Sequence, residues 1–211
     1  MVSELGESSS QIMEFFISLR VVSVARLKGF CGRVLQQTLE KVSKNCRFEF
    51  VCNSYLELDQ SILHVLENAL THLIRNSIDH GIESPEDRTK SDKDPSGLLK
   101  LEITKSGTEM LRVELKDDGK GIDAAKLKSI VAAKGIFSAE ALDSMSPEKA
   151  FELIFVDGLS PRTEVSDVSG RGVGMSAVKA EIEAIGGEIK IHSELGRGTT
   201  FTLLVPRLFK L

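Results

Sequence analysis

The chain has 211 residues, of which 41% are hydrophobic and 27% are charged, and its formal net charge at pH 7 is −4. This balance is typical of a globular protein with a sizeable core and excludes a disordered chain. The sequence has no tryptophan and one tyrosine. This composition argues against a nucleic-acid-coating protein, which would need a basic stripe with stacking aromatics, and we expect no nucleic acid among its partners.

The three cysteines are odd in number and show no CxxC spacing, which argues against a disulfide framework and a structural zinc site. The first residues are polar and show no secretory signal. The most apolar early run, residues 15–27, contains two arginines and is too short to span a bilayer. We therefore expect a cytoplasmic protein with no direct membrane insertion.

The first part of the chain predicts a linker followed by helix and then a strand. Residues 1–10 are expected to be disordered or a linker. Residues 11–45 have a largely helical pattern, with a break expected at residues 28–32. Residues 47–52 alternate in period two and predict a strand.

A long amphipathic helix is predicted next, from residue 62 to about residue 80. Its apolar residues keep a helical spacing: Ile62, Leu63, Leu66, Leu70, Leu73, Ile74 and Ile78. On the other side His72, Asn76, Asp79 and His80 follow at steps of three and four, so their side chains converge on one patch. For this helix alone a solvated polar face would be the better interpretation, and two glycine-rich segments downstream argue against it.

The remaining elements alternate between short strands and helices. Four strands are expected, the first two as a hairpin: residues 98–105, 110–116, 188–192 and 199–205. Helices are expected to begin at residues 84–85 and 146–147, each a Ser-Pro pair, and to cover residues 124–134 and 173–185. Residues 156–170 lack periodicity and predict a mobile loop. Helices collected between antiparallel strands favour an α+β two-layer sandwich with helices on one sheet face.

Two glycine-rich segments carry the chemistry. Asp117-x-Gly119-x-Gly121 directly follows a predicted strand, where a carboxylate can accept a hydrogen bond from an exocyclic amine and glycines let a flat base approach. Residues 170–175, Gly-Arg-Gly-Val-Gly-Met, open a helix whose free N–H groups and dipole attract phosphate. Each segment alone is equally typical of an ordinary turn or helix start.

Other nucleotide-binding motifs do not match. The sequence has no GxxxxGK[ST] P-loop, and no strand is predicted before the GxGxG segment, so the dinucleotide fingerprint fails as well. The HRD and DFG sequences of serine/threonine protein kinases do not occur.

Taken in order, the asparagine-bearing helix, DxGxG, GxGxG and Gly196-x-Gly198-Thr199 resemble the four nucleotide-binding boxes of the GHKL ATPase/kinase superfamily. Within it the chain is most similar to the CheA-type chemotaxis histidine kinases. Residues 57–63 with 72–83 look like that family's N box and its lead-in, and residues 168–175 look like its second glycine box.

The resemblance covers residues 19–208 and implies the fold. It is the GHKL (Bergerat) two-layer α/β sandwich, an α+β fold with a mixed, mostly antiparallel sheet and helices on one face. We expect one ATP-binding catalytic domain over residues 11–211, with residues 11–45 as a helical segment leading into it.

The resemblance also implies ATP or ADP with Mg2+ as the ligands. Asn76 would hold the Mg2+ that bridges the triphosphate. Asp117 would accept the adenine 6-amino group, supported by Gly119, Gly121 and Thr199.

Around the phosphates, the resemblance implies His72, His80 and Lys126 as catalytic residues. Residues 156–170 would act as the ATP lid. The further nucleotide-contacting positions that it implies are Arg75, Asp79, Ile122, Ser160, Gly170, Arg171, Gly172, Val173, Gly174 and Met175.

The residue at position 72 distinguishes a kinase from a hydrolase within the superfamily. GHKL hydrolases carry a water-activating glutamate four residues before the asparagine, where this chain has His72, so the resemblance favours a kinase. It implies transfer of the ATP γ-phosphoryl to a histidine on a phosphotransfer domain, on the same polypeptide or a separate one, in two-component signalling. Response regulators and chemoreceptor-array adaptors would be indirect partners. The alternatives are a non-catalytic nucleotide-binding switch module and, ranked lowest, an ATP hydrolase.

Several residues depart from the family's pattern: Ser176 at the helix start, Leu159 and Pro161 in the lid, and Ser23 and Gly32 in place of prolines in the entry segment. These changes concern lid closure and rate more than nucleotide binding. The sequence leaves open whether the chain is an excised domain or a stand-alone relative, its oligomeric state, the signal sensed and the phosphoacceptor.

Overall fold

The computed structural model describes residues 20–53, 55–156 and 174–208. Within them a five-stranded sheet has the order β2–β4–β5–β7–β6. Strand β2 runs parallel to β4, and the other neighbouring pairs are antiparallel. The strands are β2 (Cys46–Cys52), β4 (Gly97–Ser106), β5 (Met110–Asp117), β6 (Glu188–Glu194) and β7 (Gly198–Pro206).

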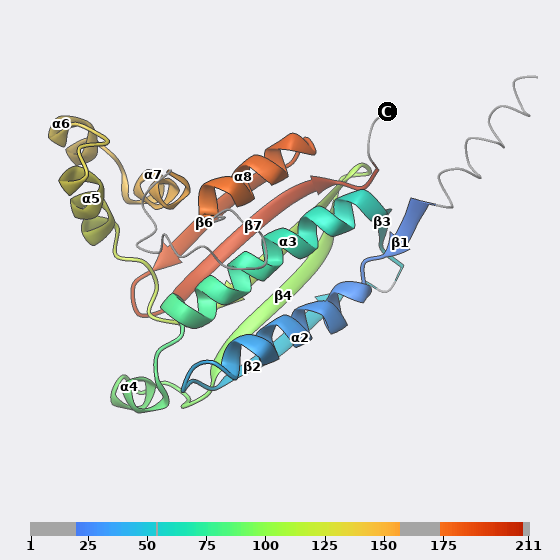
Figure 1. Cartoon of the computed structure of the whole chain (residues 1–211), viewed down its shortest axis with the longest axis horizontal. Helices are drawn as coiled ribbons and strands as arrows, with labels where there is room; N and C mark the ends of the chain where they lie inside the picture. The colour runs from blue at the N-terminus through green and yellow to red at the C-terminus, as the bar shows by residue number, and fades with distance from the viewer. Residues whose placement is uncertain (1–19, 54, 157–173, 209–211) are drawn as a thin grey trace, which may run out of the picture.

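Three helices cover one face of this sheet: α2 (Arg26–Leu39), α3 (Gln60–Asn76) and α8 (Met175–Ala184). Figure 1 shows α3 lying diagonally across the sheet between α2 and α8, and it contacts both. Along β4 the buried residues Leu99, Leu101 and Ile103 alternate with half-buried ones, as expected when one sheet face is covered. The predicted two-layer α+β fold with a mixed, mostly antiparallel sheet is confirmed.

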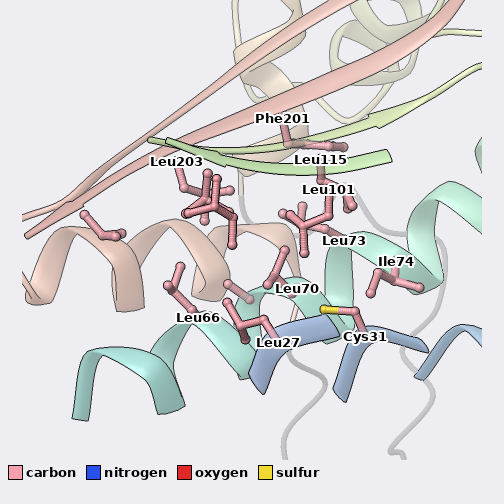
Figure 2. Packing of buried hydrophobic residues seen from close by; sticks show 14 of the residues in the cluster. Leu27, Cys31, Leu66, Leu70, Leu73, Ile74, Leu101, Leu115, Phe201 and Leu203 are labelled. Atoms are coloured by element: carbon pink, nitrogen blue, oxygen red, sulfur yellow. The ribbon is translucent and has the colours of Figure 1, made fainter. Parts of the chain in front are cut away.

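The hydrophobic core lies between the two layers and is built around α3. Figure 2 shows Leu66, Leu70 and Leu73 of this helix facing the sheet and α2. Their spacing of three and four residues places them on one side of the helix. Their partners in the figure include Leu27 and Cys31 of α2 and Leu101, Leu115, Phe201 and Leu203 of the sheet. Burial of this side fixes the rotation of α3, and therefore the direction of its polar residues.

Smaller elements complete the described chain. A second apolar cluster, Val131, Leu142, Ala150 and Leu153, joins the short helices at one end of the molecule (Figure 1). These helices are α5 (Ala124–Ala133), α6 (Ala139–Asp143), α7 (Pro147–Phe151) and η2 (Glu152–Phe155). Helix α4 (Pro85–Lys90) follows α3, and the strands β1 (Val21–Ser23) and β3 (Glu57–Asp59) form a separate antiparallel pair. None of the described helices combines the length and apolar character that crossing a bilayer requires.

The structure corrects two details of the predicted elements near α2. The break expected at residues 28–32 is wrong, because α2 continues through both glycines of that stretch. The buried side chains of Leu27, Cys31 and Leu35 keep this helix against α3, and that packing outweighs the glycines' poor helix propensity of about 1 kcal/mol each. The segment 11–45 is also not uniformly helical, since it contains β1; residues 1–19 lie outside the described ranges.

The end of α3 differs from the prediction as well. The α-helix ends at Asn76 and continues as one π-helical turn, η1 (Ser77–Gly81). The Lys44 ammonium donates to the carbonyl oxygens of Ile78 at 2.6 Å and Asp79 at 2.9 Å. A side chain 34 residues away thus satisfies carbonyl groups that the end of a helix leaves unpaired.

Candidate nucleotide-binding site

A cavity of about 290 Å³ lies where the end of α3 meets the ends of β5 and β7 and the start of α8. Its wall combines polar groups with apolar side chains, as small-molecule sites do. The residues that line it are His72, Asn76, Ser77, His80, Gly81, Asp117, Gly121, Ile122, Leu127, Ile154, Val156, Gly174, Met175, Ser176, Thr199 and Phe201.

Asp117 is the buried anion of this wall. It is the last residue of β5 and is 2% exposed. Its Oδ1 accepts hydrogen bonds from the N–H groups of Gly119 (3.1 Å) and Thr199 (3.2 Å), and its Oδ2 accepts one from the Ser77 hydroxyl (2.9 Å). A carboxylate has about four acceptor positions. Three are used by the protein, so one remains for a donor in the cavity.

The pKa of Asp117 reflects two opposing effects. Burial raises it above the ordinary 3.8, while the hydrogen bonds from Ser77, Gly119 and Thr199 oppose that rise. The net direction is upward. A donor from a ligand would favour the charged form, so ligand binding and deprotonation of Asp117 are coupled.

A pair of hydroxyl groups holds the strand ends beside Asp117. Thr199 is the cross-strand partner of Asp117, and its hydroxyl lies 3.0 Å from that of Ser193 on β6. The Ser193 hydroxyl also donates to the carbonyl of Gly198 at 3.0 Å and accepts from the N–H of Ile122 at 2.8 Å. Ser193 therefore ties the turn after β5 to the hairpin of β6 and β7.

The glycines of the Asp117 turn are required by close backbone packing. A Cβ on Gly119 would lie 2.3 Å from the carbonyl oxygen of Gly81, and one on Gly121 would lie 2.2 Å from that of Glu194. Gly121 also has φ of +72°, which favours glycine. These residues allow close packing of backbone on backbone, and only Gly121 of the two lines the cavity.

Asn76 is placed to offer an oxygen ligand. Its amide nitrogen donates to the Met175 sulfur at 2.8 Å. The amide carbonyl oxygen is therefore the group of Asn76 that could bind a cation. In the described ranges no three His, Cys, Asp or Glu side chains gather as a metal cage. Mg2+ commonly keeps several waters and uses one or two protein oxygens with substrate phosphates, so Asn76 fits such an ion.

The two histidines of the predicted patch line the cavity, whereas Asp79 of the patch and the neighbouring Arg75 do not. His72 and His80 line the wall. Burial, and secondarily Arg75, lowers the pKa of His72 below 6.5, which leaves its imidazole neutral at neutral pH. Arg75 and Asp79 are not part of the wall, and Arg75 is exposed.

The other predicted residues divide into three groups. Ile122, Gly174, Met175 and Thr199 line the cavity, and Gly174 is the residue before α8. Lys126 is exposed on α5 and is not part of the wall. Ser160, residues 170–173 and nearly all of the expected lid lie outside the described residues.

Sequence reasoning missed several residues of this site. Ser77 and Ser193 position Asp117 and its turn, and Ile154, Phe201 and Leu127 supply apolar wall. The sequence could have indicated Ser77, because it follows Asn76 on the same predicted helix. It could not have indicated Ser193, since the partners of Ser193 come from residues 71 and 6 positions away and no local pattern links them.

Comparison with known proteins identifies the family. Residues 61–208 match the model of the histidine kinase-, DNA gyrase B-, and HSP90-like ATPases, and this range contains every described wall residue. The chain belongs to that family. Membership in this ATPase family implies ATP binding, which agrees with a buried acceptor, an amide oxygen and a helix start around one cavity.

Within the family the relatives include several chemotaxis proteins CheA. The chain is 31% identical over 205 residues to the chemotaxis protein CheA of Bacillus subtilis, covering 97% of this chain and 30% of that protein. It is 41% identical over 155 residues to the gliding motility regulatory protein of Myxococcus xanthus, covering 74% of this chain and 20% of that protein. The resemblance to the CheA-type catalytic domain is therefore confirmed.

A solved structure gives the same fold. The mycobacterial sensor histidine kinase MprB is 16% identical, with a TM-score of 0.51 over 90% of this chain and 99% of that chain. The chain spans only 20% and 30% of the two relatives named above. It thus corresponds to the ATP-binding catalytic domain of much longer proteins.

Proposed function

We propose that this domain transfers the γ-phosphoryl group of ATP to a histidine on a separate phosphotransfer domain. The observation that carries the proposal is the joint placement of His72, Asn76 and Asp117 on one cavity wall. Asp117 would accept the adenine amino group, and Asn76 would hold Mg2+, which when bound supplies charge neutralisation for the phosphates.

His72 supports a kinase over a hydrolase. Water activation calls for a group that takes a proton with an appropriate pKa, and GHKL hydrolases use a glutamate at this position. Here the residue is His72, a partly buried imidazole, so the glutamate that those hydrolases use is absent at this position of the chain. In a histidine kinase the nucleophile is the acceptor imidazole: its nitrogen bonds to phosphorus as the bond to the ADP oxygen breaks, and its proton is lost to solvent.

The similarity to CheA proteins supports a proposal for the wider setting. The phosphotransfer domain would lie on the same polypeptide or on a partner, and response regulators and chemoreceptor-array adaptors would act beyond it. His80, Lys126, Arg75 and Asp79 stay as predicted nucleotide-site residues. The last three would contribute only if they reorient, because they do not form the cavity wall.

The test uses ATP labelled at the γ-phosphate and a histidine phosphotransfer domain from a CheA-type protein. We expect label on the phosphotransfer domain, and none when its acceptor histidine is replaced by glutamine. Without that domain we expect the ATP to stay largely intact, because phosphoryl transfer depends on a positioned acceptor.

Other outcomes support the alternatives. Nucleotide binding without transfer to any phosphotransfer domain would favour the switch module. Rapid phosphate release by the chain alone, reduced in an Asn76→Ala variant, would favour a hydrolase. Label on this chain itself would contradict the proposal.

A further inference from the structure

A partly buried cluster of charged side chains lies outside the nucleotide site, beside the turn that follows Asp117. At its centre is Arg88 of α4, whose side chain is 1% exposed. Arg88 pairs with Glu83 at 3.0 Å and with Asp118 at 2.7 Å, and Lys93 pairs with Glu83 at 2.9 Å. None of these residues lines the cavity. Because buried charges are expensive, such a cluster needs contacts beyond its ion pairs.

The two cations also hold the backbone next to Asp117. The carbonyl oxygen of Asp118 accepts from Arg88 Nη1 at 3.2 Å and from Lys93 Nζ at 3.0 Å. The carbonyl oxygen of Gly119 accepts from Lys93 Nζ at 2.8 Å. One ammonium group therefore contacts two successive peptide units of the turn.

Because the carbonyl groups of Asp118 and Gly119 are held by these cations, the N–H groups of the same peptide units are held in the opposite direction. A trans peptide unit carries its C=O and N–H in opposite directions. The first unit directs the Gly119 N–H at Asp117 Oδ1, 3.1 Å away. The second directs the Lys120 N–H at the carbonyl of Gly81, 2.9 Å away, at the end of η1. A cation on the oxygen also polarises the peptide and strengthens its N–H as a donor.

We propose that Lys93, together with Arg88, is a positioning residue for recognition of the base. It orients the peptide that holds the Asp117 carboxylate, and in this way sets the affinity for adenine without touching the nucleotide. The proposal rests on the proposed function, in which Asp117 accepts from the adenine amino group. Lys93 is 19% exposed and Arg88 is almost fully buried, so Lys93 is the better residue to change.

The test compares two nucleotides in two variants by titration calorimetry. Lys93→Met removes the ammonium and keeps the apolar stem. We expect it to weaken ADP binding about tenfold, as for one impaired buried hydrogen bond. Purine riboside diphosphate lacks the 6-amino group, so its affinity should change less than about twofold. The separate variant Lys93→Arg keeps a cation at this position, so we expect it to bind ADP with nearly wild-type affinity.

Lys90→Met is the matched control. Lys90 is the last residue of α4, its side chain is 75% exposed, and it pairs with Asp87 on the surface. We expect no change for either nucleotide in this variant. The double variant Asp117→Asn/Lys93→Met should lose no more ADP affinity than Asp117→Asn alone, because both changes act on one interaction.

The outcomes separate this proposal from the proposed function. An equal loss for both nucleotides in Lys93→Met would overturn the positioning role, because it would indicate a general disturbance of the fold. Unchanged ADP binding would overturn it too. If Asp117→Asn itself leaves ADP affinity unchanged, the base site of the proposed function fails. Partial unfolding lowers the fitted stoichiometry and not the ratio of the two affinities, so the comparison holds for a destabilised variant.

Discussion

At the scale of single residues, Asp117 and His72 face one cavity, and the pKa of each is shifted in the direction of its uncharged form. Burial is the first cause in each case, and it raises the pKa of the acid and lowers the pKa of the imidazole. The matching part of a nucleotide would oppose this shift in each case: an amino donor at Asp117 and phosphate oxygens at His72. The protonation of both groups is therefore coupled to ligand binding.

The lowered pKa of His72 predicts a pH dependence of stability. The unfolded chain titrates near 6.5 and the folded chain lower, so between these values the unfolded state binds more protons. The stability is complete above 6.5 and falls as the pH drops through the folded-state pKa. Because His72 is partly exposed, we expect a loss below about 1 kcal/mol.

Urea unfolding over a pH series measures this effect. His72→Gln should remove part of the acid-side loss, whereas His64→Gln should not. His64 lies on the same helix with a side chain that is 74% exposed, which makes it a matched control. An identical pH profile for wild type and His72→Gln would contradict the assignment.

At the scale of elements, the turn after β5 depends on backbone crowding. We predict that Gly119→Ala strongly impairs the site, because its Cβ would lie 2.3 Å from the Gly81 carbonyl, which belongs to η1 and cannot move aside freely. The overlap should cost at least about 1–3 kcal/mol of stability, the typical price of overpacking, and should weaken ADP binding.

Gly32→Ala in α2 is the contrasting change. A Cβ there meets nothing within 4 Å, so the substitution should stabilise the protein by about 0.5–1 kcal/mol through helix propensity. Thermal unfolding of both variants with ADP titration checks the pair. A Gly119→Ala protein with normal stability and affinity would show that the turn can shift.

At the scale of the whole molecule, the site exists only when distant segments come together. Its described wall joins α3, η1, β5, η2, α8 and β7, so the unfolded chain has no equivalent site. ADP with Mg2+ should therefore raise the unfolding free energy, by about 2.7 kcal/mol at a concentration one hundred times the dissociation constant.

The measurement is thermal unfolding over a range of ADP concentrations. The midpoint should rise with ADP, and Asp117→Asn should reduce the rise at equal ADP. A guanine nucleotide is the control, because its position-6 oxygen is an acceptor and cannot donate to Asp117. An equal rise with both nucleotides would mean that the base is not read by this carboxylate.

The sequence by itself determined most of the elements and most of the wall. Helical spacing in α3 fixed which of its sides is buried, and period-two alternation located the hairpin of β4 and β5. The ordered motifs then identified His72, Asn76, Asp117 and Thr199, which the fold does bring to one cavity. Such features could be predicted because periodicity and turn chemistry are properties of neighbouring residues.

Only the tertiary structure decided how distant residues support one another. The Ser77–Asp117 hydrogen bond spans 40 positions and the Arg88–Asp118 pair spans 30, and neither leaves a local pattern. The continuity of α2 through its glycines and the exposure of Lys126 likewise depend on which surfaces other elements cover. The physical reason is that burial and hydrogen bonding across the fold are set by non-local packing, which can override the local preferences of the chain.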